Sequence, residues 1–447
     1  MRQVILYFIF FTACFATQTN AQVRRLSLEK CIEHAINNNI DIKTKEKDLK
    51  RKEIELSTNK NSWLPNLNAG IEENFNFGRS PSTEGIYLEQ NSSNTSFGAQ
   101  LNMPLFDGFK IHNNIESSKL NLNASVESLN KAKEDLSIKV TSSFLQVLYN
   151  KEIMKISQMQ VSLTEEKVKE TDALVETGRV PLAQLYDIKA QLAKDKLTLV
   201  ESNNNTELAL LDLLQLLELE RSDANYDIVS PQTEDILKEY MGSILPPKNI
   251  YNNAVIAKPH IKEQEYLLES QKKLLKVAQA DYYPKLDFNL SYLNGYYHYY
   301  DSDKNESFSD QIKRNEQKII GFTLSIPIFN RFAVRNNVRM ARVNISNQEL
   351  VIENTKKALY KEIQQAYYNA IGAQEKYLAS REAVTASKEA LQYAEDRYLT
   401  GKNSVFEYND TKTKYTQSLY ERAQAKYEYI FRAKILDYYN GVPITLQ

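Results

Sequence analysis

The sequence is poor in residues that interrupt regular secondary structure. It contains only 12 glycines and 11 prolines in 447 residues, which favours long, uninterrupted elements. It has two cysteines, and Cys14 lies in the apolar N-terminal segment. Cys31 is therefore expected to be the single thiol of the exported chain, and no intrachain disulfide is predicted. After the N-terminus no stretch approaches the ~18 apolar residues of a membrane-spanning helix, so any membrane crossing is expected to be made by strands.

The sequence also lacks the residue patterns of an enzyme or of a nucleic-acid-binding protein. Its 56 basic and 57 acidic residues leave a net charge of −1, so no basic surface for nucleic acid is predicted. The histidines His34, His112, His260 and His298 are scattered without the spacing of a metal site. Neither a GxSxG nucleophile motif nor a phosphate-binding loop is present. We therefore predict no enzymatic activity, no cofactor and no metal.

The N-terminus has the layout of a bacterial secretory signal peptide. Arg2 gives a basic start, residues 4–15 form an apolar run, and Ala21 supplies a small residue at the end of the segment. We predict cleavage after Ala21. An alternative takes residues 11–14 as a lipoprotein box, in which Cys14 would be lipidated. Both interpretations export the chain from the cytoplasm.

Two halves of the chain carry the same ordered set of short segments. The segment "LPNLNAG" corresponds to "YPKLDFN", which places Pro65 and Pro284 at an offset of 219 residues. Further along, Pro104 corresponds to Pro327 and "TGR" corresponds to "TGK", both at an offset of 223 residues. Several anchors in one order with nearly constant spacing indicate a tandem duplication.

Each half contains a hairpin in which apolar and polar residues alternate. One face of the first hairpin carries Leu67, Ala69, Ile71, Phe75, Phe77, Thr95, Phe97, Ala99, Leu101 and Met103. The second hairpin carries Leu286, Phe288, Leu290, Tyr292, Ile320, Phe322, Leu324 and Ile326 in the same way. Alternation with period two predicts strands, and ~10 residues suffice to cross a bilayer at a tilt. The apolar face is expected to contact lipid and the Asn-, Ser- and Gln-rich face to line water, although a soluble hairpin packed on a core is an alternative.

Each half also contains two long helices joined by a short turn. The first stretch, residues 109–177, has no glycine or proline, and at ~1.5 Å per residue it is roughly 100 Å long. Valines such as Val140 and Val147 recur within it with the seven-residue period of a coiled coil. Gly178 and Gly401 are expected to end the first helix of each pair in a left-handed conformation. The predicted helices are 28–60, 109–177, 181–220, 250–282, 332–399 and 403–440.

Proline marks each change between helix and strand. It cannot donate a hydrogen bond to the ladder of a sheet, and its fixed φ turns the chain. We therefore predict that Pro65 and Pro284 lie where a helix gives way to a strand, and that Pro104 and Pro327 lie where a strand gives way to a helix.

The ordered set of leader, duplication, strand hairpins and long helices with "TG" turns resembles the TolC family of outer-membrane efflux proteins (outer membrane factors). The segments "MPLFDGFK" and "RYLTGKNSVFEYNDTK" carry the most recognisable local similarity, and the resemblance extends from Leu26 to Gly441. It implies an α+β membrane protein and a homotrimer, in which four strands per chain form a twelve-stranded β-barrel. This barrel continues as a long α-helical coiled-coil barrel in the periplasm. Four strands cannot close a barrel, and an open edge is not tolerated in lipid, so the strands themselves also require several copies.

The duplication and the resemblance together predict the organisation of the chain. Its parts are a signal peptide (1–21), a first repeat (22–220) with a strand hairpin at 66–103, an inter-repeat equatorial segment (221–249), a second repeat (250–441) with a strand hairpin at 285–326, and a short C-terminal tail (442–447). The resemblance implies a location in the outer membrane of a Gram-negative bacterium, with an extension into the periplasm.

The resemblance implies a passive exit duct of a tripartite efflux or type I secretion system. The partners that it implies are outer-membrane lipid, a periplasmic adaptor (a membrane fusion protein) and an inner-membrane transporter of the RND or ABC type, which supplies the energy. The alternative is a non-conducting periplasmic coiled-coil scaffold anchored in the outer membrane. A polar strand face favours the duct, because a scaffold gains nothing from a water-lined wall.

The candidate functional residues lie near the two helix turns. In the TolC family, carboxylates at the positions of Glu407 and Asp410 ring the periplasmic entrance, although the resemblance leads us to expect Asp at 407. The alternative is that both are solvated carboxylates on a helix. The residues that we assign to the turn tips and to adaptor contact are Gly178, Val180, Pro181, Leu182, Tyr398, Thr400, Gly401, Val405 and Phe406. For the apolar ones, packing within the chain is the alternative.

Overall fold

The structure is a computed structural model that describes residues 24–446, except for 82–84, 90, 221–225, 232–236, 238–243 and 301–304. The expected signal peptide and Cys14 therefore lie outside the described residues. The chain divides into two compact units. The helical unit contains Met1–Lys45, Asn130–Lys258 and Lys357–Gln447, and the sheet unit contains Glu46–Leu129 and Pro259–Lys356.

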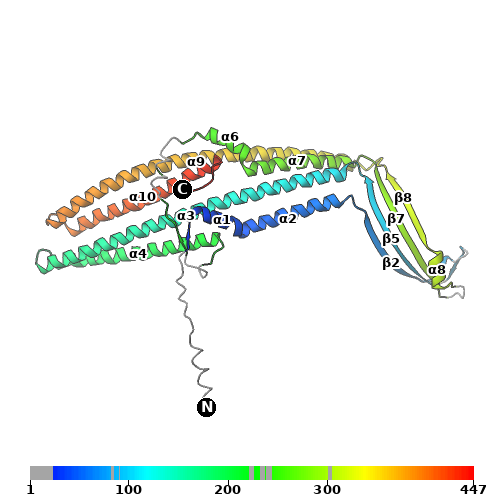
Figure 1. Ribbon diagram of the computed structural model, residues 1–447, viewed down its shortest axis with the longest axis horizontal. Helices are drawn as coiled ribbons and strands as arrows, with labels where there is room; N and C mark the ends of the chain where they lie inside the picture. Colours follow the sequence, from blue (N-terminus) through cyan, green and yellow to red (C-terminus); the bar gives the residue numbers. More distant parts are fainter. Residues whose placement is uncertain are drawn as a thin grey trace, which may run out of the picture. The chain divides into compact units, whose positions relative to one another are not determined.

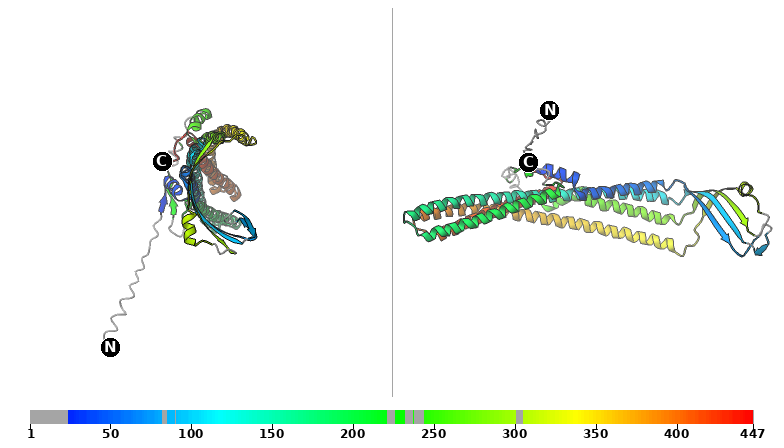
Figure 2. Two further views of the ribbon diagram at one scale, coloured as in Figure 1. Left: turned by 90° about the vertical axis from the view of Figure 1, so that its right-hand side faces the viewer. Right: turned by 90° about the horizontal axis from the view of Figure 1, so that it is seen from below.

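The sheet unit is built around one antiparallel four-stranded sheet (Figure 1). Its strands, in spatial order, are β2 (Asn66–Asn76), β5 (Ser92–Phe106), β7 (Lys285–Tyr299) and β8 (Gln317–Ser325). Each repeat thus supplies one hairpin, and the two hairpins meet between β5 and β7. Two strands within the first hairpin, β3 (Arg79–Pro81) and β4 (Tyr87–Glu89), pair only with each other. The sheet is curved across its strands (Figure 2).

The strand register confirms the two faces expected from the alternation. One row across the four strands is apolar and consists of Leu67, Leu101, Leu290 and Ile320. The adjacent row, which faces the opposite side, consists of Asn66, Asn102, Asn289 and Gly321. Successive residues of a strand point to opposite faces, so most apolar residues of the four strands gather on one face of the sheet. Leu293 and Ile319 are exceptions, because they lie in the register of the polar face.

Three of the four prolines lie where the sequence predicts them. Pro65 and Pro284 immediately precede β2 and β7, and Pro327 follows the end of β8. The prediction is wrong for Pro104, which lies inside β5. Pro104 is tolerated there because β2 begins opposite Asn102, and because the pairing with β7 shifts register just after Pro104.

The segment "DGFK" after β5 turns the chain sharply into helix α3 (Lys110–Glu176). The carboxylate of Asp107 accepts hydrogen bonds from the backbone N–H groups of Lys110, at 3.0 Å, and of Ile111, at 2.6 Å. Gly108 has a φ of +69°, and a Cβ there would lie 2.7 Å from the carbonyl oxygen of Ala280. Only glycine therefore fits this position, and Asp107 provides acceptors for donors that a helix start leaves unpaired.

Two helix hairpins form most of the helical unit (Figures 1 and 2). In the first, α3 turns into α4 (Leu182–Leu216), and in the second, α9 (Ala333–Leu399) turns into α10 (Val405–Tyr439). Val140 and Val147 of the predicted coiled-coil seam are fully buried. A core cluster of Ile156, Val384, Leu419 and Ala423 joins α3 to both helices of the second hairpin.

Both hairpin turns contain the predicted left-handed glycine. Gly178 and Gly401 each have a φ of +72°. The N–H of Arg179 donates to the carbonyl of Leu174 at 2.9 Å, and the N–H of Gly178 donates to the carbonyl of Val175 at 2.9 Å. This is the Schellman pattern of a helix C-terminus. The corresponding bonds at the second turn are Lys402 N to Arg397 O and Gly401 N to Tyr398 O.

Each of the two shorter predicted helices is in fact two helices. Residues 28–60 form α1 (Leu28–Asn38) and α2 (Ile40–Asn61), and residues 250–282 form α6 (Pro247–Ala257) and α7 (Pro259–Ala280). The second break falls at Lys258 because a residue before proline is disfavoured in the helical region. The first falls at Asn39, which is extended and whose amide donates to the carbonyl of Leu216 at 3.1 Å.

The breaks at Asn39 and Lys258 occupy equivalent places in the two repeats. Asn39 contacts Leu216 near the end of α4, and the ammonium of Lys258 lies 3.2 Å and 6.0 Å from the ring centroids of Tyr438 and Tyr439 near the end of α10. Leu216 and Tyr439 are 223 residues apart, which is the offset of the repeat. The duplication is therefore visible in tertiary contacts as well as in sequence.

The described part of the inter-repeat segment and the C-terminal tail both pack in the helical unit. Strand β6 (Tyr226–Ile228) pairs in parallel with β1 (Arg24–Leu26). In the tail, Ile444 and Leu446 are buried, and the N–H of Leu446 donates to the carboxylate of Glu29 at 3.1 Å. Among the described residues, no helix is both long enough and apolar enough to span a membrane.

Candidate functional site at the helix turns

A buried lysine organises the helical unit near the two hairpin turns. Lys167 on α3 has a side chain that is only 6% exposed, and its ammonium lies 2.7 Å from the carboxylate of Glu170 and 3.0 Å from that of Glu395 on α9. The same ammonium lies 5.7 Å and 5.4 Å from the ring centroids of Tyr398 and Tyr408. We call these five residues the Lys167 cluster. It connects α3 of the first repeat to α9 and α10 of the second.

The electrostatics of the Lys167 cluster favour the charged lysine and the neutral tyrosine. Burial alone would lower the pKa of Lys167, but hydrogen bonds to Glu170 and Glu395 outweigh it and the pKa is raised. Burial raises the pKa of Tyr408 to about 12, against the opposing effect of the nearby Lys167 charge. The two carboxylates balance the charge of the ammonium, and the carboxylates and the two aromatic rings take the place of the water that burial removes.

Two of the residues assigned to the turn tips lie inside this region. Tyr398 and Val405 are 6% and 3% exposed and pack with Ile188 and Tyr408 in one core cluster. The Tyr398 hydroxyl also lies 3.3 Å from the hydroxyl of Thr171. For Val405 this supports the alternative of packing within the chain, and its contact with an adaptor stays a prediction.

Other residues of the turns do present surface. The side chains of Leu182 and Phe406 are 54% and 79% exposed, and Pro181 is exposed as well. Val180 is half-buried, and the hydroxyl of Thr400 donates to the carbonyl of Asp396 in its own helix at 3.0 Å. Of the apolar residues assigned to adaptor contact, Leu182 and Phe406 are therefore large and exposed, and Leu399 beside the second turn is 56% exposed as well.

The two predicted entrance carboxylates each have a partner within their own helix. Glu407 completes a capping box: its carboxylate accepts from the backbone N–H of Ser404 at 2.9 Å, while the Ser404 hydroxyl accepts from the N–H of Glu407 at 3.3 Å. Asp410 pairs with Lys414 at 2.7 Å, and both side chains are at least half exposed. Glu407 thus starts α10 as well as carrying charge.

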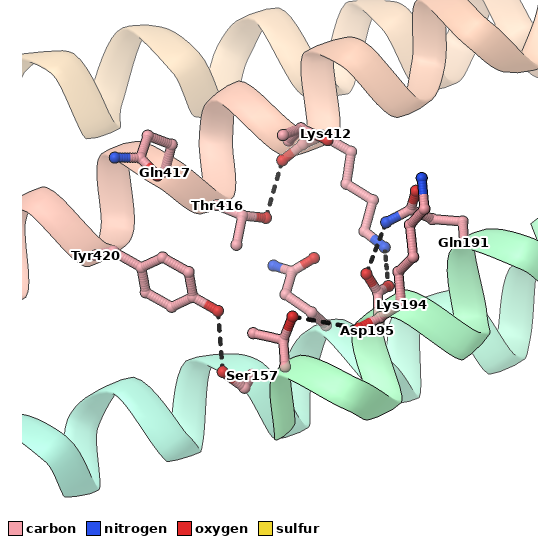
Figure 3. Close-up of a pocket in the computed structure, with 11 residues that line it drawn as sticks. Ser157, Gln191, Lys194, Asp195, Lys412, Thr416, Gln417 and Tyr420 are labelled. Atoms are coloured by element: carbon pink, nitrogen blue, oxygen red, sulfur yellow. Dashed lines mark hydrogen bonds and ion pairs between the residues drawn. The ribbon is translucent and has the colours of Figure 1, made fainter. Parts of the chain in front are cut away.

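A second buried ion pair joins α4 to α10 (Figure 3). The ammonium of Lys412 lies 2.8 Å from the carboxylate of Asp195, and the two side chains are 6% and 12% exposed. Asp195 also accepts hydrogen bonds from Thr164 at 2.5 Å and from Gln191 at 2.7 Å. The pair borders a polar cavity of about 190 Å³, which Ser157 and Tyr420 also line.

Sequence reasoning missed the two buried lysines described above, Lys167 and Lys412. Lys167 and Lys412 stand in helices that are rich in lysine, and nothing in their local pattern separates them from solvated neighbours such as Lys414. Their cross-repeat partners lie 228 and 217 residues away.

The chain offers no obvious catalytic chemistry in its described part. Burial raises the pKa of the Cys31 thiol to about 12, so it is held as an unreactive thiol at neutral pH. Across the described ranges, no group of three or more His, Cys, Asp or Glu side chains could hold a metal ion.

Comparison with known proteins places the chain in a family. Residues 31–218 and 250–436 match the family model described as "Outer membrane efflux protein". The chain belongs to this family. As an outer membrane efflux protein, it carries the matched region twice, once in each repeat, and its location is the outer membrane.

Individual relatives of this outer membrane efflux protein are distant but cover most of its length. It is 18% identical over 363 residues to the outer membrane efflux protein BepC of Brucella suis biovar 1 (strain 1330), an alignment that covers 80% of this chain and 72% of BepC. It is 20% identical over 385 residues to the outer membrane protein TolC of Salmonella enteritidis, covering 85% of this chain and 74% of TolC. Among solved structures, CusC is similar with a TM-score of 0.78 at 16% identity, covering 94% of this chain and 93% of CusC.

Proposed function

We propose that this outer membrane efflux protein is a passive exit duct formed by three copies of the chain. The observation that carries the proposal is a four-stranded sheet with one apolar and one polar face, whose outer strands β2 and β8 each pair on one side only. In lipid, unpaired backbone groups have no water to bond to, so each edge requires a strand from another copy. Twelve strands from three copies close such a wall, with the polar rows facing a water-filled lumen.

The duct operates within a tripartite efflux or type I secretion system. The exposed side chains of Leu182 and Phe406 at the hairpin turns support a contact with a periplasmic adaptor, because exposed large apolar residues at the tip of a helical hairpin favour a protein partner. An inner-membrane transporter of the RND or ABC type supplies the energy. A non-conducting scaffold is less well supported, because it has no use for a polar strand face.

The entrance of the duct carries negative charge from Glu407 and Asp410. Their exposure supports this proposal, because capping and ion pairing within α10 leave both carboxylates in contact with solvent. A ring of carboxylates in a constriction favours cations over anions.

The closure of the sheet is tested by disulfide cross-linking between copies. In a Cys31→Ala background, cysteine at Thr323 on β8 is combined with cysteine at each position of β2, and the membranes are oxidised. We expect covalent dimers and trimers for β2 positions on the same face of the wall as Thr323. Cysteine at Asn102 on the central strand β5, combined with Thr323→Cys, is the control and stays monomeric.

Conduction is measured on the same material in planar bilayers. Trimeric protein with stepwise ion conductance supports the duct. Trimers that insert without conductance would favour the scaffold, and a monomer in mild detergent with no cross-links would contradict the assembly itself.

A further inference from the structure

Strand β7 extends six residues beyond the point where its partner β8 begins. The β7–β8 pairing ends at Leu293 opposite Gln317, whereas on its other edge β7 pairs with β5 as far as Tyr299 opposite Ser92. The free part of β7 lies at the end of the sheet remote from the prolines that join it to the helices (Figure 1). Over residues 294–299, one edge of β7 therefore has no strand beside it in the described structure.

Side-chain amides occupy this edge in place of a strand. In an antiparallel sheet, alternate residues direct both their N–H and their C=O towards the same neighbour. Gln311 accepts from the N–H of Tyr297 at 2.9 Å and donates to its C=O at 2.8 Å. Asn305 does the same for Tyr299, at 2.8 Å and 2.7 Å.

A third amide continues the same alternation. The amide of Asn315 donates to the C=O of Gly295 at 2.8 Å. Gly295, Tyr297 and Tyr299 are thus the residues whose backbone faces the absent strand. Tyr297 and Tyr299 are each bonded at both backbone groups to one amide, whereas the N–H of Gly295 donates to the side chain of Asn294 at 2.8 Å and its C=O accepts from Asn315. We call Asn305, Gln311 and Asn315 the amide clamp.

A short helix, α8 (Phe308–Arg314), holds the amide clamp in position. Gln311 projects from α8 and is 6% exposed. The side chain of Asn294 on β7 donates to the carbonyl of Ile312 at 2.8 Å, and the ring of Phe308 packs edge-on against Tyr296 at 5.4 Å between centroids. The Asn294–Ile312 hydrogen bond and the Tyr296–Phe308 ring contact therefore hold α8 against β7.

A bare strand edge beside an intermolecular junction is a hazard, because it offers a second template for pairing. A one-residue slip of a strand would exchange its apolar and polar faces, and the turn does not prevent slippage where the loop is long. We propose that the amide clamp is a register stop: it closes the β7 edge, so that β2 of a second copy pairs with β8 alone and in a single register. This inference rests on the proposed assembly of three copies.

The variant Gln311→Ala removes the central amide and leaves both backbone groups of Tyr297 without partners, and Asn305→Ala combined with Gln311→Ala removes two of the three. Lys313→Ala is the matched control, because Lys313 is exposed on the same helix. Each variant is placed in the Thr323→Cys background with cysteine scanned along β2. We expect one dominant set of β2 partners in the parent and in Lys313→Ala. In the clamp variants we expect the yield of cross-links at these β2 positions to fall at least threefold. New cross-links should appear at β2 positions two residues away from them.

Amide hydrogen exchange over residues 295–299 provides a second readout that needs no cysteine. We expect slow exchange in the parent and at least tenfold faster exchange in Gln311→Ala. Gln311→Glu keeps the acceptor but loses the donor, so it serves as the milder variant if Gln311→Ala does not insert, and we expect it to exchange at an intermediate rate.

The outcomes separate the two proposals. Unchanged cross-link positions with unchanged exchange in the clamp variants would overturn the register stop while leaving the trimer intact. An absence of cross-links in the parent protein would instead overturn the proposed assembly.

Discussion

The ammonium of Lys412 on α10 lies 2.8 Å from the carboxylate of Asp195 on α4, so a buried ion pair connects the last helices of the two repeats. Both side chains are largely buried, and a buried charge that loses its partner keeps the cost of its burial. The pair therefore ties the two helix hairpins together through charge as well as through apolar packing.

We expect Asp195→Asn and Lys412→Met each to lower the free energy of unfolding of the helical unit by ~3–5 kcal/mol. The double variant is expected to be less damaging than the sum of the two, because it leaves no unpaired charge. Lys414→Met, whose ion pair with Asp410 is exposed, should change stability by less than ~1 kcal/mol. Denaturant unfolding followed by circular dichroism measures all four, and additive single and double values would contradict a direct coupling.

The Lys167 cluster predicts a loss of stability at high pH. The folded pKa of Tyr408 is raised from 10.0 to about 12, so the folded state favours the neutral phenol. This contribution is fully present below pH 10 and is lost as the pH rises from 10 towards 12. The raised pKa of Lys167 acts in the same direction, since its charge is also lost with rising pH.

Tyr408→Phe should therefore flatten the decline in melting temperature above pH 10, whereas Tyr393→Phe, at a position that is 70% exposed, should not. Scanning calorimetry at pH 9 and at pH 11 makes the comparison. An identical decline in both variants would show that Tyr408 is not the group responsible.

The register of the sheet predicts which substitutions the membrane wall tolerates. Leu101→Arg or Phe322→Arg places a charge on the apolar face and should cost ~2–4 kcal/mol near the middle of the bilayer. Gln100→Arg and Thr323→Arg lie on the polar face and should be tolerated. Heat-dissociation of the assembled protein on gels ranks the four variants, and equal damage on both faces would mean that the faces are wrongly assigned.

The entrance charge predicts a change in conduction without a change in folding. Glu407→Gln combined with Asp410→Asn should weaken cation selectivity and block by multivalent cations in planar bilayers. Glutamine can still accept the hydrogen bond from Ser404 in the capping box, so α10 and the yield of assembled protein should be unaffected. Single-channel recording with unchanged selectivity and unchanged block would remove both carboxylates from the functional residues.

The regular parts of this molecule are predictable from sequence because they depend on local patterns. Alternation from Leu67 to Phe75 and from Phe97 to Met103 predicts the two faces of the first hairpin, and glycine at 178 and 401 predicts both turns. The strand that is predicted to end at Pro104 continues for two more residues, to Phe106. Proline removes one hydrogen-bond donor but does not forbid a strand, and at Pro104 β2 no longer lies beside β5.

The functional detail was not predictable, because it depends on residues far apart in the chain. Asp195 and Lys412 lie in different repeats, and an isolated charge in a lysine-rich helix gives no indication that it is buried. Asn305 and Gln311 belong to a polar segment that reads as an ordinary loop. Only the unequal lengths of β7 and β8 show what these amides replace.

The equivalent positions Asn39 and Lys258 show how far the two repeats have diverged. A neutral amide contacts the end of α4 at one, while a buried cation covered by aromatic rings contacts the end of α10 at the other. In the proposed trimer, the helical wall therefore has threefold and not sixfold symmetry. Two kinds of contact between repeats alternate around the axis, one within each chain and one between neighbouring chains. A wall with two kinds of boundary can loosen along one kind while the other holds, an asymmetry that a ring of six identical halves could not have.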